Sequence, residues 1–284
     1  MEHLNSFTGP IAPVQYLCIG HCCHDKLEDR NVLGGTASYA SLVAGRLGMK
    51  TGILTSLGPD FEFFRVFEER NIQVFSKSAD KTTVFENIYR NGLRTQYLHE
   101  RSATICLDDV PAAWQSAPVV QFCPIADEVD FSLLRAFPNA LRAATIQGWL
   151  RKWDSEGKIS PKAMDWQQLA ALDIVIMSDA DIAGFENAIP EIASLVRVLV
   201  ITQGANGARV FHEGQEYFFP SFPVREVDAT GAGDVFATAF ILKYAGTDDV
   251  STAAAFAHVA ASFVVEGVGI NNLDALEKIR ERLE

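Results

Sequence analysis

The sequence lacks any apolar run that approaches the ~20 residues of a membrane-spanning helix. It is also short of basic charge, since 24 Lys and Arg against 36 Asp and Glu give a net charge of −12. Nucleic-acid backbones are bound by clustered Lys and Arg, so we expect neither nucleic acid nor a membrane as a partner. A small anionic ligand stays open, because backbone amides can hold a phosphate inside an acidic protein.

Cysteine is scarce, with five residues scattered along 284. An odd number of cysteines in a chain of this length suits free thiols in a reducing compartment. The first ten residues lack the basic and apolar regions of a signal peptide, and we expect a cytoplasmic protein. His21-Cys-Cys-His24 has the composition of a metal site. Neighbours on a strand face opposite ways, however, so we interpret this run as a strand end.

The remaining composition, 48% hydrophobic and 21% charged, is that of an ordinary globular protein, and we expect a single domain over residues 1–284. Short apolar runs that read as strands alternate with stretches of helical spacing. The strands are expected at residues 14–20, 51–58, 119–123, 144–147, 174–177 and 198–202. The helices are expected at residues 36–47, 61–70, 131–137, 166–171, 250–265 and 273–283, with one more that begins at residue 180 and another that ends at residue 244. This alternation predicts an α/β fold with a doubly wound, mostly parallel sheet flanked by helices.

Residues 73–102 have a different pattern, in which polar and apolar positions mix along three short strands. Arg90-Asn-Gly-Leu-Arg94 separates the last two, and Asn-Gly favours a hairpin. We therefore expect a small antiparallel flap, or lid, mainly within residues 73–102. Asp25 is expected in a loop before Gly34-Gly35. A second hairpin is expected around Glu213-Gly214.

The run Asp228-Ala-Thr-Gly-Ala-Gly-Asp234 stands directly before an apolar helical stretch. Such a turn can aim several backbone N–H groups at an anion, and the helix N-terminus adds partial positive charge. A carboxylate at Asp234 could then take a proton from an attacking hydroxyl. The plainer interpretation is an acidic N-cap, which the two internal glycines make less fitting.

Two segments carry a resemblance to a known family. Gly34-Gly-Thr-Ala-Ser-Tyr-Ala-Ser-Leu-Val-Ala-Gly-Arg-Leu-Gly48 resembles the N-terminal signature of the ribokinase-like (PfkB) carbohydrate kinases, and residues 227–240 resemble their C-terminal signature. The likeness extends over nearly the whole chain. Residues 82–102, together with Gln147-Gly-Trp-Leu-Arg151, look most like the myo-inositol kinase branch.

The resemblance implies a role for each matching position. It implies Asp234 as the catalytic base, with Gly231, Ala232 and Gly233 as the anion hole for the transferred phosphoryl group. It implies Asp25 and Gly35 as the substrate site, with Tyr39 in or beside that pocket. The nucleotide site that it implies consists of Thr202, Gly204, Gly207 and His258. It further implies potassium near Asp228 and Thr230, and magnesium held by Asp181 through water. Plainer interpretations stay open: a solvated loop for Asp25, a tight turn for Gly35, packing for Tyr39, a strand end for Thr202 and a core histidine for His258.

The chain departs from the family at two places. Tyr39 replaces the usual Asn, and Ser178-Asp-Ala-Asp181 replaces an Asn-x-x-Glu element on the metal side. A hydroxyl and a shorter carboxylate can still orient magnesium-bound water, because Mg²⁺ keeps several waters.

The leading hypothesis is therefore an ATP- and Mg²⁺-dependent kinase, with K⁺ as a further cofactor, that phosphorylates a hydroxyl of a small sugar or cyclitol. The lid would close over this polyol and could also pair two copies as a homodimer. One alternative is a nucleoside kinase with Phe85, Tyr89 and Tyr97 as an aromatic clamp. Another is a catalytically silent binding protein. A dinucleotide-dependent dehydrogenase is not expected, since no Gly-x-Gly-x-x-Gly follows the first strand.

Overall fold

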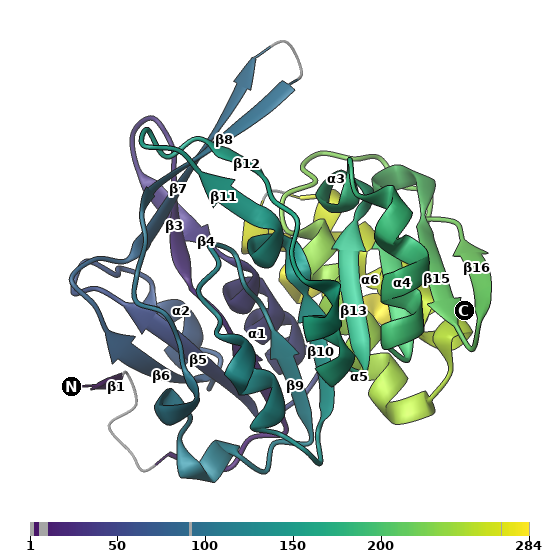
Figure 1. Cartoon of the computed structure of the whole chain (residues 1–284), viewed down its shortest axis with the longest axis horizontal. Coiled ribbons are helices and arrows are strands. Elements are labelled where there is room, and N and C mark those ends of the chain that lie inside the picture. The colour runs from purple at the N-terminus through teal and green to yellow at the C-terminus, as the bar shows by residue number, and fades with distance from the viewer. Residues whose placement is uncertain (1–2, 6–10, 91–92, 268, 284) are drawn as a thin grey trace.

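The computed structural model describes residues 3–5, 11–90, 93–267 and 269–283. Its centre is a ten-stranded sheet (Figure 1). The strands follow the order β1 (His3–Asn5), β6 (Gln73–Ser78), β5 (Thr51–Leu57), β2 (Tyr16–Ile19), β9 (Val119–Phe122), β10 (Leu141–Thr145), β13 (Ile174–Ser178), β14 (Val198–Thr202), β15 (Ala208–His212) and β16 (Gln215–Phe219). The strands from β6 through β14 pair in parallel, while β1, β15 and β16 add antiparallel edges.

The order of the strands reverses between β2 and β9. From β2 the chain adds β5 and β6 on one side, and from β9 it adds β10, β13 and β14 on the other. In doubly wound sheets the crevice at such a reversal, outside the carboxyl ends of the strands, is where ligands bind. The predicted doubly wound, mostly parallel sheet is confirmed, and its reversal marks the place of a site.

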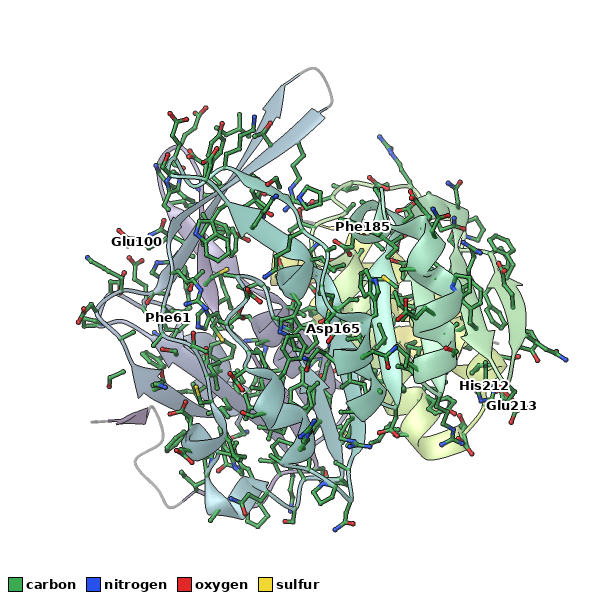
Figure 2. All side chains as sticks on the ribbon, in the orientation of Figure 1. Phe61, Glu100, Asp165, Phe185, His212 and Glu213 are labelled. Carbon is green, nitrogen blue, oxygen red and sulfur yellow. The ribbon has the colours of Figure 1, made fainter. Side chains whose placement is uncertain are left out.

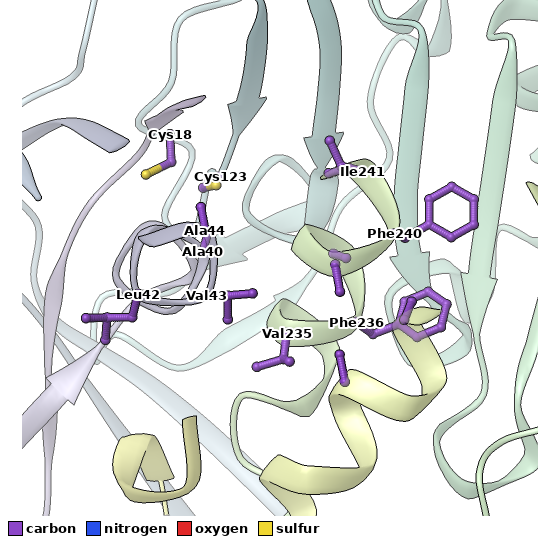
Figure 3. Close-up of a cluster of buried hydrophobic side chains, with 14 of the residues drawn as sticks. Cys18, Ala40, Leu42, Val43, Ala44, Cys123, Val235, Phe236, Phe240 and Ile241 are labelled. Carbon is purple, nitrogen blue, oxygen red and sulfur yellow. The ribbon is translucent and has the colours of Figure 1, made fainter. Parts of the chain in front are cut away.

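Helices cover both faces of the sheet. One face carries α1 (Thr36–Arg46), α5 (Ala232–Thr247) and α6 (Val250–Val265), and the other carries α4 (Ile189–Leu195) and several 3₁₀ turns (Figure 1). Alternate residues of β2 enter the two cores, since Tyr16 and Cys18 face α1 and α5 while Leu17 and Ile19 face the opposite layer. Figure 3 shows the first core, where apolar side chains of α1 and α5 lie side by side against the sheet.

The lid is a separate four-stranded sheet in the order β4 (Asn31–Gly34), β3 (Cys23–Lys26), β7 (Thr83–Arg90) and β8 (Leu93–Glu100). It rises from the large sheet on the side of the N-terminal half (Figure 1). The β3–β7 pair is parallel and the other two pairs are antiparallel. A short hairpin of β11 (Arg151–Trp153) and β12 (Ile159–Pro161) leans on it, with Leu98 N–H donating to the Gly157 carbonyl at 2.8 Å.

Two parts of the lid prediction need correction. Gln73–Ser78 belongs to the large sheet, where its mixed polarity reflects a place near the edge beside β1. Asp25 lies on a lid strand rather than in a loop, because Cys23–Lys26 pairs with β4 on one side and with β7 on the other. The sequence did not indicate this strand, since its last two residues are polar and only partly buried or exposed. Residues 83–90 and 93–100 form the hairpin as expected.

Several helices are shorter than predicted or are 3₁₀ turns. The remaining α-helices are α2 (Phe64–Glu68), α3 (Asp179–Ile182) and α7 (Ile279–Leu283), and the 3₁₀ segments are Leu107–Asp109, Ala112–Trp114, Phe131–Arg135, Ile146–Leu150, Trp166–Ala171, Glu186–Ala188, Gly204–Asn206 and Gly269–Lys278. Figure 2 sets the side chains on this frame, with Phe61 near the foot of the lid and His212 at the opposite edge of the sheet. No helix in the described ranges is long and apolar enough to cross a bilayer.

Candidate active site

A polar cavity of about 590 Å³ opens between the lid and the carboxyl ends of the strands at the reversal. Its wall includes Asp25 from β3, Arg94 from β8 and Arg151 from β11. The first turn of α5 closes its floor with Asp234. Elements far apart in the sequence therefore bring carboxylates and guanidinium groups to one chamber, which suits a ligand with many hydroxyls.

A second cavity of about 330 Å³, mostly apolar, lies on the other side of the same turn. Thr202, Gly204, Gly207 and His258 all line it. The two cavities share Glu226, Ala229 and Gly233 in their walls. The N-terminal turn of α5 is thus the partition between them, and a group transferred from one cavity to the other would pass over it.

The turn itself depends on Gly231, the N-cap of α5, whose φ of 79° lies in the left-handed region. A β-carbon there would fall inside contact distance of the Tyr39 ring. Tyr39 is only 4% exposed, and its ring packs directly against this turn. Gly233 faces open space, which leaves the backbone amides at the start of α5 accessible to an anion.

Asp234 and Asp25 are carboxyl groups with perturbed acidity. Burial raises the pKa of Asp234 to about 6, against a hydrogen bond from Thr36 and the charge of Arg151, which lower it. The negative charge of Asp25 raises it further. Burial likewise raises the pKa of Asp25 to about 6, while Arg94 and Arg151 lower it. A carboxyl group with a pKa near 6 is a better proton acceptor at neutral pH than an ordinary aspartate.

Comparison with known proteins identifies the fold and the family. The model of the pfkB family of carbohydrate kinases matches residues 22–277. The chain belongs to this family. Inositol 3-kinase of Arabidopsis thaliana is 25% identical, over 94% of this chain and 79% of its own length. Ribokinase of Bacillus subtilis is 25% identical, over 84% and 83% respectively. A pyrophosphate-dependent kinase in the ribokinase family has the same fold, with a TM-score of 0.80 and 20% identity over 92% of this chain and 99% of that one.

As a member of the pfkB family, the protein is a phosphotransferase that acts on an alcohol group. The polar cavity brings together residues to which the sequence assigned several roles. The residues expected to bind the acceptor, the potassium ion and the transferred phosphoryl group, with the expected base, line it: Asp25, Gly35 and Tyr39; Asp228 and Thr230; Gly231 and Gly233; and Asp234. Ala232, the third residue expected in the anion hole, lines the apolar cavity. Gly35 has a φ of 93°, and a β-carbon there would collide with the His21 carbonyl. The backbone turn therefore accounts for this glycine, whatever else it touches.

Asp181 differs from the other site residues of this pfkB kinase. It is absent from the walls of both cavities. Its carboxylate caps α3 by accepting from Ser178 N–H at 2.9 Å and Ser178 Oγ at 2.7 Å, and it accepts from Gln147 Nε2 at 2.9 Å. Ser178 and Asp181 thus form a capping box. Gln147 does line the polar cavity, so it connects Asp181 to the site.

Reasoning from the sequence did not assign roles to Gln147 and Arg151, although it noted the motif that contains them. Gly148 explains that motif, because a β-carbon there would strike the backbone of Pro124 and Ile125. The 3₁₀ turn can therefore lie against the loop after β9, and Arg151 Nη1 donates to the Ile125 carbonyl at 3.0 Å. The Arg151 guanidinium also lies 5.7 Å above the Phe85 ring, and burial lowers its pKa to about 10.

Of the two described side chains expected in the aromatic clamp of a nucleoside kinase, Phe85 lines the polar cavity and Tyr97 does not. Phe85 is 2% exposed and covered by Arg151. Tyr97 is absent from the cavity wall and stacks on His99, with ring centroids 6.4 Å apart. The side chain of Tyr89 lies outside the described residues. The side of the cavity facing the lid presents instead Asn87, Arg94 and Gln96, among which Asn87 Oδ1 accepts from Arg94 Nε at 2.8 Å and from Gln96 Nε2 at 3.0 Å.

The two perturbed carboxyl groups predict an acidic limb in the pH profile. Below about pH 6 both become protonated, so kcat/KM for the acceptor should fall as the pH drops through that value. Removing the charge of Asp25 with Asp25→Asn should lower the pKa of Asp234 and move the remaining limb to lower pH. Steady-state rates between pH 4.5 and 8 test this. A limb unmoved in Asp25→Asn would contradict the coupling of the two groups.

Proposed function

We propose that this protein transfers the terminal phosphoryl group of ATP to one hydroxyl of a small uncharged polyol of the sugar or cyclitol class. The observation that carries the proposal is the meeting of the polar cavity and the apolar cavity at the first turn of α5, with Asp234 on the polar side. An acceptor in the first and a nucleotide in the second would bring hydroxyl and phosphate together there.

In this reaction Asp234 takes the hydroxyl proton while the oxygen attacks the terminal phosphorus. A new O–P bond forms, the bond from that phosphorus to the bridging oxygen breaks, and ADP leaves with the bond pair. The amides of Gly231, Ala232 and Gly233 face the charge that grows on the phosphoryl oxygens. Asp25 accepts hydrogen bonds from acceptor hydroxyls and fixes which oxygen approaches Asp234.

Asp181 fits a magnesium site that works through water. A carboxylate has about four lone-pair positions, and hydrogen bonds from Ser178 and Gln147 take three in this structure. The position left suits a metal-bound water better than direct ligation. When bound, Mg²⁺ would neutralise charge on the donor phosphates. We place the potassium ion at Asp228 and Thr230, whose turn is closed by a 2.9 Å bond from Thr230 N–H to Asp228 Oδ1.

His258 supports ATP as the donor. It lines the apolar cavity, and burial lowers its pKa to about 4, so the ring is neutral. Its hydrogen bond to the Phe219 carbonyl occupies one ring nitrogen. Nε2 has no partner among the described residues. We propose that the neutral ring carries its proton on Nδ1, which would leave Nε2 as a buried hydrogen-bond acceptor for the amino group of adenine.

The choice of donor gives a direct test of that assignment. ITP carries a carbonyl oxygen where ATP carries the amino group, and this oxygen cannot form a hydrogen bond with Nε2 if both are hydrogen-bond acceptors. We expect KM for ITP to exceed that for ATP by roughly threefold to tenfold. His258→Leu should raise KM for ATP and bring the two values together. Discrimination that survives in His258→Leu would remove His258 from the base site.

The acceptor is tested by a phosphorylation screen with pentoses, hexoses, inositols and nucleosides, using ATP or pyrophosphate and with or without potassium. Turnover of a free sugar or inositol with ATP supports the proposal. Turnover of nucleosides alone, or of pyrophosphate in preference to ATP, would overturn it. Measured ATP binding without any turnover would favour a silent binding protein instead.

Two broader proposals accompany this function. The free cysteines at 18, 22, 23, 106 and 123 support a reducing compartment, and we place the protein in the cytoplasm.

The edge strand β4 has no neighbour on its outer side among the described strands, which supports a homodimer formed through the lid. Sedimentation of the purified chain would separate monomer from dimer.

A further inference from the structure

Glu128 is a carboxylate with no solvent exposure, in the loop after β9. Its oxygens accept from three backbone N–H groups. Ile125 N–H donates at 3.1 and 3.0 Å, Ala126 N–H at 2.6 Å and His21 N–H at 3.0 Å. A buried charge is costly unless hydrogen bonds surround it, and this one is surrounded by main-chain donors.

The donors come from the two loops that leave the sheet at its reversal. His21 lies between β2 and the lid strand β3 that carries Asp25, whereas Ile125 and Ala126 follow β9. The His21 ring continues the network into the base of the lid, with Nδ1 2.7 Å from Thr83 Oγ1 on β7 and Nε2 2.9 Å from the Ala103 carbonyl. Glu128 therefore holds together the loops on either side of the reversal.

One peptide group links Glu128 to the polar cavity. The group joining Ile125 to Ala126 gives its N–H to Glu128 and accepts from Arg151 Nη1 with its carbonyl. The carboxylate and the guanidinium thus polarise the same peptide from opposite ends, an arrangement in which each hydrogen bond strengthens the other. On the side of the cavity, this series of hydrogen bonds ends at Arg151, which lines the cavity together with Asp25 and Asp234.

We propose that Glu128 is a positioning residue for acceptor binding, and that it acts through the Ile125–Ala126 peptide to hold the Arg151 guanidinium in the polar cavity. This inference rests on the proposed function, because it assumes that the acceptor occupies that cavity. Glu128 itself does not line the cavity, although its hydrogen-bond partner Ile125 does. Its effect is therefore on where Arg151 lies, and the donor cavity, which contains neither residue, is not involved.

The test is a double-mutant cycle on acceptor KM and donor KM. Glu128→Gln keeps the size of the side chain but removes the charge and puts an amide donor against main-chain donors. We expect acceptor KM to rise by about ten- to a hundredfold with little change in ATP KM. In an Arg151→Leu background no guanidinium is left to position, so Glu128→Gln should add almost nothing to acceptor KM.

Asp109→Asn is a matched control for the loss of a buried carboxylate. Asp109 is 8% exposed, accepts from Lys77 Nζ and Cys106 N–H at 2.9 and 2.8 Å, and lies in neither cavity wall. It should lower thermal stability and leave acceptor KM unchanged. If Glu128→Gln does not fold, Glu128→Asp, which keeps the charge, replaces it in the cycle with the same expectation of non-additive losses.

The outcomes separate this inference from the proposed function. Effects on acceptor KM that add in the double variant, or that raise ATP KM equally, would mean that Glu128 only stabilises the fold, and would overturn the positioning role while the polyol kinase stands. A wild-type enzyme that phosphorylates no polyol overturns the proposed function itself. In that case calorimetric binding of the polyols to wild type and Glu128→Gln decides the inference: weaker binding in the variant supports it, and equal or undetectable binding in both overturns it.

Discussion

Asp234→Asn should lower kcat by roughly a hundredfold to ten-thousandfold, the contribution usual for a general base. The asparagine side chain has the same shape and can still accept a hydrogen bond from Thr36, but it cannot take a proton from the hydroxyl of the acceptor. Because the carboxyl group is already costly to bury, as its pKa of about 6 indicates, the neutral variant should fold at least as well. ATP KM and thermal stability should stay close to wild type.

Asp165→Asn provides the comparison. Asp165 is likewise an aspartate at the start of a helical segment, since it caps Trp166–Ala171 by accepting from Gln167 N–H at 3.1 Å, but it lies in the opposite layer of the molecule (Figure 2). It should cost a little stability and no activity. Rapid-quench measurement of the chemical step, with saturating acceptor and ATP, compares the variants directly. Near-normal turnover by Asp234→Asn would disprove its role as the base.

Gly231→Ala should be the most damaging change that adds a single carbon. A left-handed backbone costs an alanine about 1–2 kcal/mol, and the new methyl group would overlap the Tyr39 ring. Either the ring or the first turn of α5 must move, and the amides proposed to face the phosphoryl group would move with that turn. We expect kcat to fall by at least about a hundredfold, as when one donor of an anion hole is lost.

Two further variants separate strain from collision. Gly214 has a similar φ of 73° but meets nothing within contact range, so Gly214→Ala should lose stability alone. Tyr39→Asn removes the ring, and in combination it should restore part of the activity lost in Gly231→Ala. Unchanged activity in the combined variant would show that backbone strain, rather than Tyr39, accounts for the loss. Thermal melts and kcat measured on the same preparations give both quantities.

The parts of the fold that could be read from the sequence have a simple physical basis. The buried strands are continuous apolar runs, because helices cover both faces of the sheet. The α6 helix runs from Val250 to Val265 as predicted, since Asp249 caps it by accepting from Thr252 N–H. The Asp/Gly run before α5 could be located because its unusual backbone demands glycine. Residues expected in each half of the site accordingly meet in separate cavities.

The parts that were missed depend on tertiary contacts. Cys23–Lys26 has no strand pattern of its own and pairs only because β4 and β7 flank it. Gln73–Ser78 resembles a lid strand because an edge position leaves it partly polar. Glu128 and Arg151 could not be linked from the sequence, since they meet through a peptide of the loop after β9 and no spacing encodes that contact.

The path of the chain has an evolutionary consequence. Groups that would hold the acceptor come from the lid and from β11, all before residue 152, while Thr202 and His258, which would hold the nucleotide in the apolar cavity, follow β13. Among the described residues, Glu226, Ala229 and Gly233 line both cavities. Selection could therefore exchange one specificity without disturbing the other. A recombinant joined within β13, taking its first half from a relative with a different acceptor, should inherit that acceptor and keep its own nucleotide preference.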